Sequence, residues 1–180
     1  MALDNATPEG KKAIEILEYS IPEEERADMG VLRSMLPEKY ELVEWSLMDS
    51  DRTVGYCAFI RSSEVIFGLY LAIDSELRGK GYGSKALDMM FGGSHSGFPA
   101  FFGVETPDDK ASNNQQRLAR IRLYERFGFR VSDIKMKNRF NGIGMSIMWN
   151  AKTEEEKGLL FDIIEDMMIK GGAYEMIADP

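Results

Sequence analysis

The stretch LYLAIDSELRGKGYGSKALDMM, residues 69–90, places an apolar run, a short polar segment and three glycines directly before a helical pattern. Glycine weakens a helix by up to about 1 kcal/mol relative to alanine, so Gly79, Gly81 and Gly83 need another explanation. A glycine-rich turn between a strand and a helix exposes backbone N–H groups at a helix N-terminus, where the helix dipole favours negative charge. The stretch therefore predicts an anion-binding turn, most often one for phosphate.

The glycine spacing excludes one familiar phosphate-binding loop and disfavours another. The chain lacks the G-x-x-x-x-G-K-[ST] pattern of nucleoside-triphosphate loops. Residues 81–86, GYGSKA, fit the looser G-x-G-x-x-A pattern of dinucleotide-binding folds, but that pattern opens the first unit of a parallel sheet. Here three strands joined by short turns come first, so a dinucleotide site is disfavoured. A purely structural loop is the remaining alternative.

Hydrophobic periodicity predicts an α/β protein with a mixed sheet and helices on both of its faces. Strands are expected at 11–19, 40–48, 53–60, 64–73, 100–105, 130–137 and 142–149, and helices at 22–36 (one, or two short ones), 81–91, 113–129 and 153–170. The turns at 49–51 and 61–64 are too short for helical crossovers, so the strands that they join should pair antiparallel. The pattern indicates a core over about 11–150 with an appended C-terminal helix.

The composition narrows the classes of partner. A net charge of −8 argues against a nucleic-acid binder, which would carry a basic surface, and favours a cationic partner. No apolar run approaches the ~20 residues of a membrane span, and the N-terminus lacks the apolar region of a signal peptide. The single cysteine, Cys57, is expected to be buried and inert, and no metal site can be assembled around the single histidine, His95. These features predict a cytoplasmic protein without a metal.

Two sequence motifs together resemble those of a known superfamily. Residues 78–83, RGKGYG, read R-x-x-G-x-G after the apolar strand IFGLYLAID, and residues 120–129, RIRLYERFGF, form a helix end with a tyrosine and a glycine-aromatic stop. In this order the motifs resemble those of the GNAT superfamily of N-acetyltransferases. The resemblance implies one GNAT domain over residues 1–180 and acetyl-CoA as cosubstrate. It also implies a largely antiparallel sheet that splays beyond the strand before the R-x-x-G-x-G loop.

The resemblance assigns two groups of residues to coenzyme binding. The backbone amides expected to hold the pyrophosphate belong to Arg78, Gly79, Lys80, Gly81, Tyr82, Gly83 and Ser84. The strand residues expected to pair with the pantetheine arm and to polarise the thioester carbonyl are Leu71, Ala72 and Ile73. Glycine in the turn lets the backbone approach the phosphates without an intervening Cβ, and the side chains of Arg78 and Lys80 add positive charge.

The resemblance also implies an acid and a base. Tyr124 lies where the family carries the tyrosine that protonates the coenzyme A thiolate. A phenol of pKa ~10 matches the acidity of an alkyl thiol of pKa ~8.5. Glu105, at the end of the strand 100–105, is the expected base for the acceptor ammonium, directly or through water, and Asp74 is a weaker alternative. The competing interpretations are a packed aromatic for Tyr124 and a strand-end charge for Glu105.

One position departs from the family pattern. Many members carry an asparagine about seven residues before the tyrosine, and this chain has Arg117 there. Asn113 and Asn114 lie further back, so either could replace that asparagine or neither. For Arg117 and Arg120 a solvated basic face is favoured over contact with coenzyme phosphates.

Three functions are compatible with these residues. The leading one is an N-acetyltransferase that acts on a primary amine by direct attack in a ternary complex. The acceptor is expected to be cationic, as a small molecule or a protein amine, and to contact residues 22–36 and 131–149. The second function is a coenzyme-binding regulatory module that has lost turnover. The third is an interaction protein that uses its C-terminal helix, and a homodimer is compatible with each.

Overall fold

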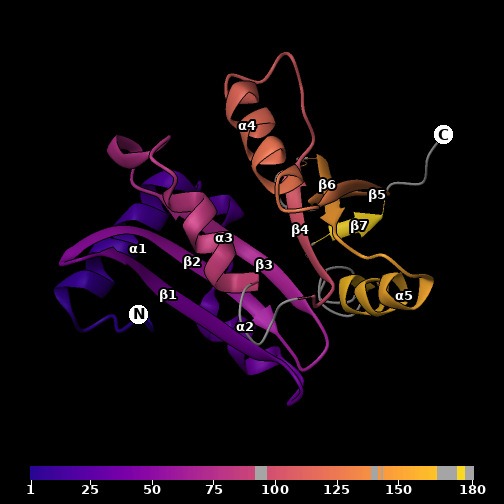
Figure 1. Cartoon of the computed structure of the whole chain (residues 1–180), viewed down its shortest axis with the longest axis horizontal. Helices are drawn as coiled ribbons and strands as arrows, with labels where there is room; N and C mark the ends of the chain where they lie inside the picture. Colours follow the sequence, from indigo (N-terminus) through magenta and orange to yellow (C-terminus); the bar gives the residue numbers. More distant parts are fainter. Residues whose placement is uncertain (92–96, 139–141, 143, 166–173, 177–180) are drawn as a thin grey trace. The chain divides into compact units, whose positions relative to one another are not determined.

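The computed structural model describes residues 1–91, 97–138, 142, 144–165 and 174–176, and it forms two compact units, Met1–Phe98 and Pro99–Pro180 (Figure 1). The first unit contains α1 Pro8–Ser20, the 3-10 turn η1 Glu23–Glu25, α2 Met29–Met35, β1 Glu41–Asp49, β2 Arg52–Arg61, β3 Ile66–Ile73, η2 Ser75–Leu77 and α3 Tyr82–Phe91. The second contains β4 Ala100–Glu105, α4 Asn114–Glu125, β5 Arg130–Asn138, β6 Gly144–Trp149, α5 Glu154–Ile163 and β7 Tyr174–Met176.

The prediction of a strand at 11–19 is wrong, because this segment is the body of helix α1. Thr7 is the N-cap, and its hydroxyl accepts the Gly10 amide at 3.1 Å. Pro8 occupies the first turn, where its missing N–H costs nothing. Ala13, Ile16 and Leu17 are buried at helical spacing, and their burial against the sheet prevails over the apparent alternation of the sequence.

The first unit is built on an antiparallel sheet in the order β1-β2-β3, which confirms the hairpins predicted from the short turns. Its two faces are covered by different helices. Tyr56 and Ala58 of β2 pack in one cluster with α1. Cys57 lies between them and donates to Sδ of Met90 in α3 at 3.4 Å. Because successive strand residues face opposite sides, α1 and α3 cover opposite faces of this sheet.

Cys57 provides a test of this packing. Burial raises the pKa of the Cys57 thiol from 9.0 to about 12, and the thiolate is the reactive form. We expect the native protein at pH 8 to react with a disulfide reagent ~10³-fold more slowly than the protein unfolded in urea. Because the chain has a single cysteine, the unfolded protein is its own control. Equal rates in the two states would contradict the buried position.

The helical region predicted at 22–36 forms two short elements, η1 and α2. No residue of α2 is fully buried, although Met29 is partly buried and packs against the core cluster that α1 forms with the sheet. The Arg33 guanidinium pairs with Glu44 of β1 at 2.7 Å, and the buried Tyr56 hydroxyl donates to the second Glu44 oxygen at 2.8 Å. Val31 and Met35 are more than half exposed. The segment expected to contact the acceptor is thus tied to the sheet by the Glu44 carboxylate of β1 and by the Tyr70 hydroxyl of β3, which donates to the Glu25 carbonyl and accepts the Ala27 amide.

The second unit has a sheet in the order β4-β6-β5-β7, antiparallel throughout. Strands β5 and β6 confirm the predicted pair of C-terminal strands, whereas edge strand β7 was not predicted. Helix α5 begins with a capping box between Thr153 and Glu156. The predicted helix at 153–170 is confirmed over Glu154–Ile163, and residues 166–170 lie outside the described residues, as does His95.

Candidate functional site

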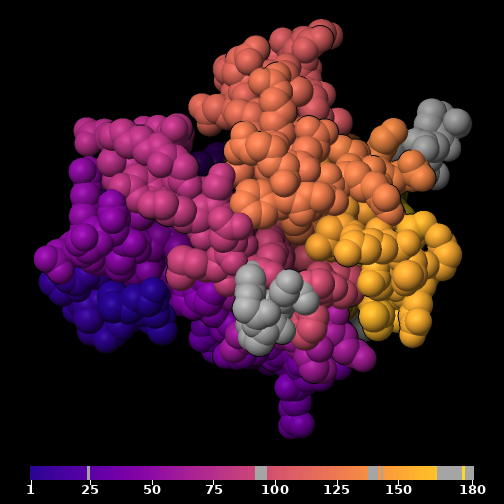
Figure 2. Space-filling model, viewed as in Figure 1, coloured from indigo at the N-terminus to yellow at the C-terminus, as the bar shows by residue number. Residues whose placement is uncertain are grey.

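The glycine-rich turn is an exposed loop between β3 and α3 in the first unit, visible in pink at the upper left of Figure 2. Gly79 and Gly81 have φ angles of +76° and +87°, in the left-handed region that favours glycine. The first α3 hydrogen bond runs from the Lys85 amide to the Gly81 carbonyl at 3.0 Å. The amides before Lys85 are therefore the N-terminal donors that a helix leaves without an intrahelical acceptor. Open backbone amides at a helix N-terminus can bind an anion.

Two side chains of the turn bind the protein itself. Nε of Arg78 donates to the Ile73 carbonyl at 3.1 Å, and one terminal nitrogen donates to Oγ of Ser20 at 3.2 Å. The Tyr82 hydroxyl donates to Oδ2 of Asp49 at 2.5 Å, and this hydrogen bond raises the pKa of Tyr82. Both contacts fasten the turn to neighbouring elements, so its backbone amides offer the more direct anion contact.

The predicted pantetheine strand pairs with β2 along one of its edges. Leu71, Ala72 and Ile73 lie opposite Cys57, Tyr56 and Gly55 in antiparallel register. Asp74, which follows them, accepts the Glu76 amide at 3.0 Å and begins η2. The base role considered for Asp74 therefore competes with a local capping role.

Gly81 can be tested against another glycine with the same backbone conformation. We expect Gly81→Ala to weaken acetyl-CoA binding ~10-fold or more, because a methyl group and a shifted backbone disturb the amides that would face the pyrophosphate. Gly97 is the control, since its φ is +89° and an added Cβ there, as at Gly81, meets no atom within 4 Å. Both variants should lose comparable stability, and Gly97→Ala should keep its affinity by calorimetry. Equal affinity losses would remove the phosphate role from the turn.

In the second unit Tyr124 lies on α4 and is 5% exposed. Its ring is stacked on Phe102 of β4 at 4.1 Å between centroids, with an interplanar angle of 4°. Phe129, just beyond the helix, lies at 6.2 Å in a tilted arrangement. The ring is thus held rigidly by packing, which serves a positioned phenolic acid and a purely structural aromatic equally well.

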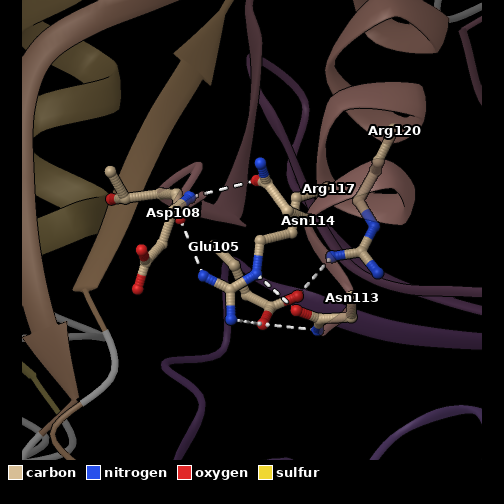
Figure 3. A network of polar contacts seen from close by, with 7 residues as sticks. Glu105, Asp108, Asn113, Asn114, Arg117 and Arg120 are labelled. Atoms are coloured by element: carbon tan, nitrogen blue, oxygen red, sulfur yellow. Dashed lines mark hydrogen bonds and ion pairs between the residues drawn. The ribbon is translucent and has the colours of Figure 1, made fainter. Parts of the chain in front are cut away.

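Glu105 ends β4 as a buried carboxylate, 7% exposed, within a polar cluster (Figure 3). Its Oε1 accepts Nδ2 of Asn113 at 3.2 Å and pairs with Arg117 at 2.9 Å, and its Oε2 pairs with Arg120 at 3.2 Å. A carboxylate offers about four acceptor sites, so one site on Oε2 stays unused by these contacts. These contacts tie the end of β4 to helix α4.

Arg117 is a fully engaged member of this cluster. Its Nε donates to Oδ1 of Asn113 at 2.9 Å, one terminal nitrogen donates to the Thr106 carbonyl at 2.8 Å, and the other pairs with Glu105. Its side chain is only 13% exposed. The solvated basic face favoured for Arg117 is therefore wrong, because the arginine satisfies a buried carboxylate and a strand-end carbonyl.

Asn114 orders the loop that leads into α4. Its Oδ1 accepts the Asp108 amide at 3.0 Å, and its Nδ2 donates to Oδ1 of Asp109 at 3.1 Å. Asn113 and Asn114 thus both hold structure around the start of α4. The Glu105 cluster was missed from the sequence, although arginines at positions 117 and 120 share a helix face.

Over the part of the chain that the structure describes, no group of three or more His, Cys, Asp or Glu side chains could hold a metal ion. None of the helices described is long and apolar enough to cross a membrane.

Comparisons with known proteins agree with this architecture. Residues 43–131 match a family model described as an acetyltransferase (GNAT) domain. A GNAT-family acetyltransferase structure from Bacteroides thetaiotaomicron matches with a TM-score of 0.68 and 20% identity over 92% of this chain and 95% of that chain. No curated protein matches the chain.

Two further solved structures are similar at lower scores. An aminoglycoside 6'-N-acetyltransferase complexed with coenzyme A has a TM-score of 0.57 and 16% identity, covering 83% of this chain and 94% of its own. The ribosomal-protein-S18-alanine N-acetyltransferase from Escherichia coli has a TM-score of 0.56 and 17% identity, covering 86% of this chain and 95% of its own. At these identities the likeness establishes the fold.

Proposed function

The chain belongs to the GNAT superfamily of acetyltransferases, and we propose that it transfers the acetyl group of acetyl-CoA to a primary amine by direct attack in a ternary complex. The observation that carries this proposal is the turn before α3. It combines the R-x-x-G-x-G sequence, two left-handed glycines and the open amides of a helix N-terminus. We propose that residues 1–180 act as one GNAT domain, to which both compact units contribute.

The turn would bind the coenzyme pyrophosphate through its backbone amides from Arg78 to Ser84. Lys80 is exposed in this turn and adds charge, whereas the Arg78 guanidinium is occupied by Ile73 and Ser20. The backbone of Leu71, Ala72 and Ile73 would pair with the pantetheine arm. In this role the contacts of Arg78 fix the loop relative to the strand that receives the coenzyme.

Tyr124 and Glu105 are the proposed acid and base. The stacked ring of Tyr124 fixes the direction of its hydroxyl, as an acid for the departing thiolate requires. Glu105 would take the ammonium proton through the acceptor site that its Oε2 retains, directly or through one water. Its contacts with Arg117 and Arg120 hold the carboxylate in one orientation. The acceptor ammonium would therefore approach it from one direction.

A turnover screen tests the proposal. Thiol release from acetyl-CoA is measured with polyamines, aminoglycosides, amino acids, lysine-containing peptides and peptide N-termini, and we expect amine-dependent release with at least one class. Acetyl-CoA binding by calorimetry without any amine-dependent release would instead support the coenzyme-binding regulatory module. A negatively charged chain favours a cationic acceptor. The turnover of aminoglycosides and polyamines, compared with that of the other amines, therefore tests whether the acceptor is cationic.

A further inference from the structure

Arg120 is the incompletely paired member of the Glu105 cluster. One terminal nitrogen binds Oε2 of Glu105 at 3.2 Å, while within the described ranges Nε and the second terminal nitrogen have no hydrogen-bond partner. Figure 3 shows this second nitrogen directed away from Glu105. The side chain is 34% exposed, against 13% for Arg117, whose three guanidinium nitrogens all have partners. Arg120 therefore retains donors that an external anion can reach.

Glu105, which Arg120 contacts, has a hydrogen-bond acceptor site that these contacts leave unused. Among the residues that the structure describes, its Oε1 accepts two donors, from Asn113 and Arg117, and its Oε2 accepts only from Arg120. An unused acceptor site and an unused pair of donors thus lie on two groups that are themselves in contact. Such a pair matches a ligand that carries an ammonium and a carboxylate close together, because each end of the ligand finds its counterpart.

We propose that the acceptor is a free α-amino acid, whose carboxylate binds the unused donors of Arg120 and whose ammonium approaches Oε2 of Glu105. An α-amino acid carries its ammonium and its carboxylate on one carbon. The two groups can therefore bind Glu105 and Arg120, which contact each other, at the same time. Two guanidinium groups and one carboxylate also give the cluster a net positive charge, which favours a ligand carboxylate despite the negative charge of the whole chain.

Arg120 lies one helical turn before the proposed acid Tyr124 on α4. Arg120 precedes Tyr124 by four residues, so the two share a helix face about 6 Å apart along the axis. The inference rests on the proposed function, in which Tyr124 lies at the thioester sulfur. The phosphates are separated from that sulfur by the whole pantetheine arm. An anion at Arg120 is therefore assigned to the acceptor, and an unchanged KM for acetyl-CoA in the Arg120 variants tests this assignment.

Matched acceptor pairs test the assignment. Each amino acid is compared with the amine that lacks only its carboxylate: tyrosine with tyramine, lysine with cadaverine, histidine with histamine and phenylalanine with phenethylamine. We expect the wild-type protein to have a higher kcat/KM for the amino acid of the best pair. Arg120→Gln should raise the KM for that amino acid ~10-fold or more, because a charged hydrogen-bonding partner is lost. The KM for its amine and for acetyl-CoA should change little.

Two further variants keep the test decisive. Arg122→Gln removes the same charge from an exposed position of α4 and should keep the wild-type KM for the amino acid. Arg120→Lys leaves Glu105 a cationic partner but lacks the planar fork that binds a carboxylate through two nitrogens. It should fold like the wild type, as judged by its melting temperature, and still show a raised KM for the amino acid.

The outcomes separate this inference from the proposed function. Equal KM changes for amino acid and amine in the Arg120 variants would overturn the carboxylate site. Turnover of carboxylate-free amines alone would also overturn it and leave the proposed acetyl transfer standing. If neither series is acetylated, the inference fails, and the wider acceptor screen then decides the proposed function.

Discussion

Tyr124→Phe is expected to lower kcat for the best amine acceptor ~10²-fold or more, the usual scale for a lost proton donor. Phenylalanine keeps the ring that stacks on Phe102 and removes only the phenolic oxygen. Acetyl-CoA affinity should stay near the wild-type value, because protonation of the thiolate belongs to the chemical step. Steady-state kinetics and calorimetry on one preparation measure the two quantities together.

A purely structural tyrosine predicts a different result from the same variant. Tyr19→Phe is the matched control, since Tyr19 is 47% exposed on α1 and has no proposed catalytic role. Both variants should melt within a few degrees of the wild type, and only Tyr124→Phe should lose turnover. If the two retain similar kcat values, the Tyr124 phenol is not the acid, and its ring serves only to pack α4 on β4.

Local sequence signals predicted most elements of the fold. Alternating apolar residues with short turns gave β1, β2 and β3, and the glycine turn with apolar residues at helical spacing gave α3. The helix at Pro8–Ser20 was mistaken for a strand, because four apolar residues at 13, 14, 16 and 17 suit either period. The start signal Thr7-Pro8, an N-cap followed by proline, distinguishes the two and could have been used.

The candidate site was predictable only where its residues are close in sequence. The R-x-x-G-x-G turn is continuous, so the motif predicted backbone amides exposed at a helix N-terminus, whereas the left-handed conformation of Gly79 and Gly81 was not predicted. The Glu105 cluster joins a strand end to side chains 8, 12 and 15 positions later. Those contacts depend on the path of the loop 106–113, which bonds of Asn114 and Arg117 fix. No periodicity in the sequence reports such a path.

Glu105→Gln is expected to lower kcat ~10²-fold or more while acetyl-CoA affinity changes little. An amine of pKa ~10 is almost fully protonated at neutral pH, so a base must remove a proton before attack. Glutamine keeps the shape of the side chain but cannot take that proton. It also leaves Arg117 and Arg120 without their carboxylate, and a broken buried ion pair typically costs ~3–5 kcal/mol of stability. Rates must therefore be expressed per folded molecule.

Arg117→Gln separates the base from the buried ion pair. It breaks the same Glu105–Arg117 contact and should also destabilise the protein, yet it leaves the carboxylate in place with Arg120 still bound to Oε2. We expect urea unfolding to show comparable losses of stability in the two variants, and kcat per folded molecule to fall steeply only in Glu105→Gln. Equal losses of kcat would mean that the carboxylate acts by holding α4 and its preceding loop. Proton removal from the acceptor would then have to be assigned to another group or to water.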